Sequence, residues 1–166
     1  DGCSAGEEAI EELIEVGRST GVVVFNIIPD RNFTPGSKDQ KLANLQRVIE
    51  IIQDLGMPLL AGTEMNSPGQ KFVDDFDSDE LKPFHDQFLA GSRILHAHST
   101  LQRYAGMGYL SDWAKDQFSS LSAKNEFYAR FGETFSPRGD TALQDELKQS
   151  LGNQEVLELA DRVMAS

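Results

Sequence analysis

The segment that most constrains the fold is residues 21–29, which read GVVVFNIIP. This segment is apolar at nearly every position, rich in β-branched residues, and bounded by Gly21 and Pro29. A strand with one face in solvent alternates apolar and polar residues, whereas a continuous apolar run is typical of a strand buried on both faces. Such strands belong mainly to parallel sheets that are covered by helices, so we expect an α/β fold.

Helical patterns lie on both sides of this strand. Residues 7–17 place apolar side chains at helical spacing opposite several glutamates. The stretch from Ser37 to Gly56 begins with capping-box spacing and carries a long apolar stripe, and a third helix is expected from Asp77 or Ser78 to Gly91. The apolar positions that define these helices are Ile10, Leu13, Ile14, Leu42, Leu45, Val48, Ile49, Ile52, Leu55, Leu81, Phe84, Phe88 and Leu89.

Two further short apolar runs are predicted to be strands, MPLLAG at residues 57–62 and SRIL at residues 92–95. Helices and strands then alternate with short connections, which predicts three parallel strands joined by right-handed crossovers. From residue 101 onward the apolar residues recur only at helical spacing. We therefore expect an α/β part over residues 1–100 and an all-helical C-terminal extension over residues 101–166, packed together as one domain.

The composition argues against some partners. The formal net charge is −12 and the acidic residues are spread along the chain, so its field repels nucleic acids and anionic lipid surfaces. No apolar run approaches the roughly 20 residues that span a bilayer, and Cys3 has no second cysteine for a disulfide. We expect a cytoplasmic protein that binds neither nucleic acid nor membranes.

Because the chain does not begin with Met, we expect it to be a piece of a longer protein.

Parallel α/β folds place their functional sites at the carboxyl ends of the strands. The three expected strands end in NIIPDRN, GTEMN and HAHS. The polar residues of these three segments are therefore expected to converge on one rim of the sheet. They are Asn26, Asp30, Arg31, Asn32, Glu64, Asn66, His96 and His98.

The His-X-His pair is the strongest candidate for chemistry. Side chains on a strand alternate between its faces, so His96 and His98 would share one face and bind one cation together. Imidazole is a common ligand of transition metals, and Glu64 on the neighbouring strand would add an oxygen ligand. A metal held in this way acidifies a bound water, so hydrolysis is the expected reaction. The other interpretation is structural, with both rings facing the core and each satisfied by a backbone carbonyl.

Four other residues are candidates for roles in the site. Asp30 and Arg31 could form an ion pair that fixes the turn after Pro29. Alternatively, Asp30 is a general base or metal ligand, and Arg31 binds a carboxylate or phosphate group of the substrate. Asn66 is a candidate hydrogen-bond partner of the substrate. Arg103 lies in the segment LQRYAGMGYL, whose glycines indicate either a lid over the rim or a tight corner between helices.

At these motifs the chain resembles the polymerase-and-histidinol-phosphatase (PHP) superfamily of metal-dependent hydrolases on (β/α) barrels, and more remotely the amidohydrolases and uronate isomerases. The resemblance rests on NIIPDRN, on GTEMN, which looks like the superfamily's strand-end Gly-X-Glu, and on ILHAHS, which is similar to its later strand ending in histidine. It covers residues 21–100 and implies a partial TIM-like barrel in which Glu64 and His96 or His98 bind divalent metals. The superfamily's opening His-X-His and closing Asp-X-His are absent, so the resemblance implies the C-terminal part of such a protein.

The expected function is thus metal-dependent hydrolysis of a phosphoester or a related bond in a small-molecule substrate. One alternative is a sugar-acid isomerase of the uronate type on a similar barrel. Another is a non-catalytic binding or assembly domain whose histidines are structural. Because parallel sheets with open edges tend to associate, the expected macromolecular partner is a second copy or the missing N-terminal part of the same protein.

The roles that follow from the hydrolase hypothesis fall into three groups. The catalytic residues would be Asp30 and His98. The ligands of Zn, Mn or Fe would be Glu64, His96 and His98. The contacts with substrate would be Arg31, Asn66 and Arg103.

Overall fold

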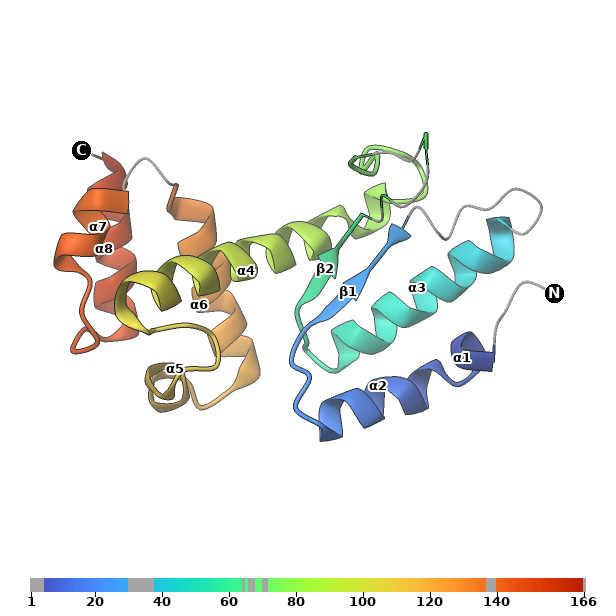
Figure 1. Ribbon diagram of the computed structural model, residues 1–166, viewed down its shortest axis with the longest axis horizontal. Coiled ribbons are helices and arrows are strands. Elements are labelled where there is room, and N and C mark those ends of the chain that lie inside the picture. Colours follow the sequence, from blue (N-terminus) through green and yellow to red (C-terminus); the bar gives the residue numbers. More distant parts are fainter. Residues whose placement is uncertain are drawn as a thin grey trace. The chain divides into compact units, whose positions relative to one another are not determined.

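The structure is a computed structural model that describes residues 5–29, 38–63, 65, 68–69, 72–136 and 140–165 (Figure 1). The chain divides into two compact units, residues 1–89 and residues 90–166. The structure is 65% helical, and its described residues contain one sheet of two short parallel strands. The expected fold, a partial TIM-like barrel with three parallel strands, is therefore wrong. None of the described helices is both long enough and apolar enough to cross a membrane.

The first unit combines helices with the two strands. Helix α1 (Ala5–Glu8) and helix α2 (Ile10–Ser19) precede strand β1 (Phe25–Ile27). Helix α3 (Lys38–Asp54) then leads to strand β2 (Leu59–Ala61). The short 3₁₀ helix η2 (Lys82–Phe84) is followed by helix α4 (His85–Ala105), which begins in this unit. Strands β1 and β2 lie side by side, and the register pairs Phe25 with Leu59, Asn26 with Leu60 and Ile27 with Ala61 (Figure 1).

One face of the strand pair packs against helices. The apolar stripe of α3 supplies Leu45, Ile49 and Ile52, each at most 2% exposed, and α2 adds Ile14. Full burial of one such side chain contributes about 1.5–3 kcal/mol to folding, so this stripe is the main reason that α3 covers the sheet. The strand residues that contact this core are Phe25, Ile27, Leu59 and Ala61.

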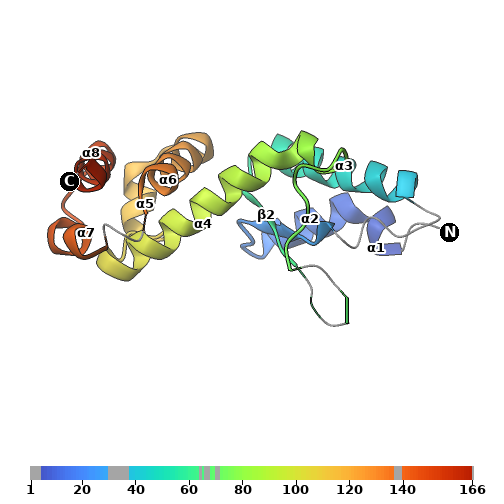
Figure 2. The ribbon, with the colours of Figure 1, turned by 90° about the horizontal axis from the view of Figure 1, so that it is seen from above.

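The third expected strand, SRIL at residues 92–95, lies within α4 instead (Figure 2). Ile94, Ala97 and Leu101 are buried at intervals of three and four residues, which is the spacing of one helix face. Gly91, the expected end of the preceding helix, is an internal residue of α4. The helix ends at Ala105, before Gly106, whose φ of +66° is a backbone conformation that favours glycine.

The second unit is helical throughout its described residues. It contains the remainder of α4, then α5 (Asp112–Gln117), α6 (Leu121–Thr134), α7 (Asp140–Glu146) and α8 (Asn153–Ala165). Ser111 and Ser120 cap α5 and α6 by accepting backbone N–H bonds at 3.1 and 3.2 Å. Helix α8 packs against α6 and α7 (Figures 1 and 2). The buried aromatic residues of this unit are Tyr109, Trp113, Phe127, Tyr128, Phe131 and Phe135.

Candidate functional site

The carboxyl ends of β1 and β2 lie next to each other. The Gly62 N–H donates to the Ile27 main-chain oxygen at 2.7 Å, and a Cβ added to Gly62 would lie 2.6 Å from Nδ2 of Asn26. The two segments that leave the sheet after these strands therefore start at the same edge. The candidates that follow these strands, Asp30, Arg31, Asn32, Glu64 and Asn66, lie outside the described residues.

His96 and His98 lie on helix α4, not on a strand. Successive side chains on an α-helix are about 100° apart, so residues i and i+2 point in directions roughly 200° apart. The expectation that both rings lie on the same face of a strand is therefore wrong. The two rings have separate partners.

The His96 ring is held by the loop that follows α6. Its Nε2 lies 3.1 Å from the main-chain oxygen of Phe135, and the two rings stack with centroids 6.3 Å apart. A carbonyl oxygen only accepts, so Nε2 carries the hydrogen and donates it. This contact ties α4 to the C-terminal end of α6.

The His98 ring is held by the loop that follows α4. The Tyr109 N–H donates to Nδ1 of His98 at 2.9 Å. Because Nδ1 accepts here, the hydrogen of the neutral imidazole is on Nε2. Each histidine thus has one ring nitrogen bonded to the main chain, which is close to the structural interpretation, although the partner of His98 is an N–H and not a carbonyl.

The glycine-rich segment after the histidines forms a tight corner. Gly106 adopts its positive φ at the end of α4, and a Cβ added to Gly108 would lie 2.5 Å from Oε1 of Gln102 and 2.9 Å from Cε1 of His98. Glycine is therefore required at residue 108 for close approach to α4. Arg103 is exposed in the last turn of α4, where a positive charge interacts favourably with the helix dipole.

The side chains around Tyr109 form a polar cluster that the sequence patterns did not indicate. The Tyr109 hydroxyl donates to Oδ1 of Asn125, and Nζ of Lys124 lies 4.1 Å from the centre of the Tyr109 ring. The Tyr128 hydroxyl donates to the main-chain oxygen of Met107 at 2.7 Å. The contacting pairs are between 15 and 21 positions apart, so no local motif brings them together.

Burial sets the charge states in this cluster. It raises the pKa of Tyr109 from 10.0 to about 12, and it also raises the pKa of Tyr128, to which the neighbouring Tyr109 adds a smaller effect. Partial burial lowers the pKa of Lys124. Both phenols therefore keep their protons at neutral pH and act as hydrogen-bond donors. The hydrogen bonds and the Lys124 contact join the loop after α4 to helix α6.

The described part of the expected metal site does not fit a shared metal ion. The two imidazoles diverge, and each uses one ring nitrogen for a main-chain hydrogen bond. Within the described ranges, no group of three or more His, Cys, Asp or Glu side chains is arranged to hold a metal ion. His96 and His98 therefore do not form the shared site that a strand would have given them.

Comparison with known proteins adds no relative. No protein-family model matches the chain, and neither a curated protein nor a solved structure shows significant similarity to it.

Proposed function

We propose that this chain is an assembly domain that associates through the outward face and the free edge of β1. This is the non-catalytic alternative among the functions that the sequence allows. The observation that carries it is a contrast within the described residues. The strand sequence suits burial on both faces, whereas only one face of β1 packs against the core. Phe25 and Ile27 contact the core, whereas Val24 is 38% exposed and Asn26 is exposed.

The edge of β1 lacks charged residues and prolines, two of the devices that keep strand edges apart. Natural edge strands carry charged residues, prolines or bulges that discourage pairing with another chain. Residues 22–28 contain neither a charged residue nor a proline. In the described sheet, β1 has β2 on one side and no strand on the other. An edge of this kind accepts an additional strand.

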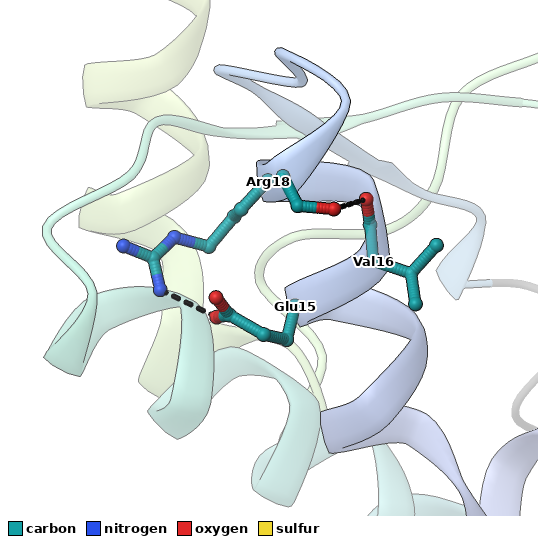
Figure 3. Close-up of polar contacts among 4 residues, drawn as sticks. Glu15, Val16 and Arg18 are labelled. Carbon is teal, nitrogen blue, oxygen red and sulfur yellow. Dashed lines mark hydrogen bonds and ion pairs between the residues drawn. The ribbon is translucent and has the colours of Figure 1, made fainter.

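A second exposed apolar surface, on α2, is less suited to self-association. Leu13 and Val16 are 51% and 54% exposed, and Figure 3 shows the Val16 side chain turned away from the ion pair between Glu15 and Arg18 (2.7 Å). The glutamates of α2 surround this apolar pair in sequence, among them the exposed Glu12. Two copies meeting here would place acidic groups against each other. The uncharged β1 segment avoids this repulsion.

Sedimentation equilibrium of the purified chain tests the proposal. The wild-type protein is expected to form a dimer whose fraction rises with concentration. Val24→Lys places a charge on the outward face of β1 and should give a monomer. Val16→Lys makes the same chemical change on α2 and should leave the dimer intact. Val24→Thr, which keeps the β-branched shape without a charge, should also remain dimeric.

The opposite pattern would reject the proposal. A wild-type chain that stays monomeric at high concentration, or a dimer that Val16→Lys dissociates and Val24→Lys does not, excludes β1 as the interface. Circular dichroism shows whether each variant retains its helices. If Val24→Lys fails to fold, the dissociation constant of the Val24→Thr dimer decides instead. A dimer weaker than wild type supports the interface, and an unchanged dissociation constant counts against it.

A second candidate is metal-dependent hydrolysis at the carboxyl edge of the strand pair. The parallel pairing favours it, because the segments that continue to Asp30 and Glu64 start at one edge. Calorimetric titration with Mn²⁺ or Zn²⁺ tests this candidate. Binding that Glu64→Gln weakens and His98→Ala leaves unchanged would support it, whereas no binding by the wild-type chain would reject it. Turnover of uronates alone would instead favour the isomerase alternative.

We propose the cytoplasm as the location of this assembly. The lone Cys3 suits a reducing compartment because it has no partner for a disulfide within the chain.

A further inference from the structure

We infer that the strand added at β1 is β1 of a second copy, running antiparallel about a two-fold axis at Asn26. This inference rests on the proposed assembly function and assigns the partner surface and its register. Asn26 then sets the register of the contact, because its main-chain N–H and carbonyl both meet their own counterparts.

The hydrogen bonds within the sheet leave the main chain of Asn26 facing outward. The Phe25 N–H donates to the Pro58 oxygen at 3.1 Å, and the Ile27 oxygen accepts from the Gly62 N–H at 2.7 Å. The main-chain groups of successive residues in a strand point to opposite sides. Those of Asn26 therefore point away from β2, toward the free edge. Asn26 makes no hydrogen bond to another residue of the part that the structure describes.

Two copies of this edge complement each other. In an antiparallel pair centred on Asn26, each copy donates its Asn26 N–H to the Asn26 carbonyl of the other. The Asn26 carboxamide lies against Gly62, on the β2 side, so the main-chain groups alone carry the pairing at the axis. Val24 lies on the same face of the strand as Asn26 and would add apolar contact beside them. No charged residue enters this pairing, which matters in a chain of net charge −12.

The outer edge of β2 is a poorer partner for β1. A contact between β1 of one copy and β2 of the next is heterologous, so it would repeat from copy to copy unless the arrangement closed into a ring. Pairing of β1 with β1 instead closes after two copies.

Cysteine cross-linking tests the register directly. With Cys3→Ser as the background, Asn26→Cys places the two sulfur atoms at the proposed axis. Directly opposed residues of a hydrogen-bonded antiparallel pair have Cα atoms about 5.5 Å apart, within the roughly 4.4–6.8 Å that a disulfide spans. Val24→Cys is the matched control, because the two Val24 residues would be about four residues out of register, roughly 13 Å apart along the strand.

We expect mild oxidation to convert most of the Asn26→Cys protein into a covalent dimer that a reducing agent dissociates, and to leave Val24→Cys uncross-linked. Asn26→Asp would place two carboxylates at the axis and should weaken the dimer by at least roughly tenfold, whereas Asn26→Ser should weaken it less. Because Asn26→Asp and Asn26→Ser introduce no cysteine, they test the register even if Asn26→Cys fails to fold.

Two results would overturn this inference and leave the assembly proposal standing. One is a dimer that cross-links at Val24→Cys and not at Asn26→Cys. The other is a dimer that Asn26→Asp does not weaken. A wild-type chain that sediments as a monomer would instead reject the assembly proposal itself.

Discussion

The main-chain oxygen of Arg93 occupies the space that a side chain at Gly132 would need. An added Cβ at Gly132 would lie 2.0 Å from that oxygen and 2.6 Å from the Arg93 carbonyl carbon. Beside this contact the Arg93 guanidinium pairs with the Glu133 carboxylate at 2.7 Å. Helices α4 and α6 therefore approach each other backbone to backbone, and the absence of a side chain at residue 132 permits the approach.

Gly132→Ala should destabilise the second unit. The methyl group cannot be placed without separating α4 from α6, and overpacking of this kind costs about 1–3 kcal/mol or more. Denaturant unfolding followed by the fluorescence of Trp113, the single tryptophan, measures the loss. Gly152→Ala is the control, because its added Cβ would come no closer than 3.5 Å to Oε2 of Glu155. Equal free energies of unfolding for the two variants would contradict the close approach.

Replacing the histidines should reduce stability by independent amounts. His98→Ala leaves the Tyr109 N–H without its acceptor, and His96→Ala removes the donor to the Phe135 carbonyl, each costing about 1–3 kcal/mol. Because the partners are separate, the double variant should lose the sum of the two effects. Thermal and denaturant unfolding provide the values, with Arg103→Ala as an exposed control. Strong coupling between the two substitutions would indicate that the rings share a ligand after all.

Alkaline pH should destabilise the fold through Tyr109. In the unfolded chain a tyrosine ionises near pH 10, whereas the pKa of buried Tyr109 is about 12. The stabilising effect of burying the neutral phenol is therefore fully present below pH 10 and is lost as the pH rises toward 12. The loss should reach roughly 2 kcal/mol in the free energy of unfolding. Tyr109→Phe should flatten this part of the stability profile, and an unchanged slope would exclude Tyr109 as its cause.

Salt should strengthen the proposed dimer. The two copies repel each other through a net charge of −12 each, while the β1 contact contains no ion pair. Raising the ionic strength from about 0.05 M to about 0.5 M shortens the range of this repulsion. Sedimentation across this range should give a dissociation constant that falls with added salt. A constant that rises would point to an interface made by ionic contacts.

The sequence correctly predicts those helices and strands whose apolar residues have a spacing that fits only one type of secondary structure. The run at residues 21–29 contains β1, and the apolar stripe from Leu42 to Leu55 gives α3, because 14 residues of helical spacing fit no strand. The four residues SRIL are too few to distinguish the spacing of a helix from that of a strand. Their helical state follows from Ile94, Ala97 and Leu101, which are buried at intervals of three and four residues along one helix face.

The expected pairing of the two histidines was wrong for the same reason. The inference that His96 and His98 share a face depended entirely on a strand, and the same two residues diverge on a helix. The partners that they do have, Phe135 and Tyr109, are 39 and 11 positions away. Contacts at such separations depend on how helices pack, so the spacing of residues within one segment does not predict them.

Amide hydrogen exchange at Asn26, followed by NMR at several protein concentrations, tests the central claim most directly. The Phe25 amide, which is bonded within the sheet, should be protected at every concentration. The Asn26 amide should exchange rapidly in dilute solution and become protected as the dimer forms. Rapid exchange of Asn26 in a solution that sedimentation shows to be dimeric would contradict the strand pairing.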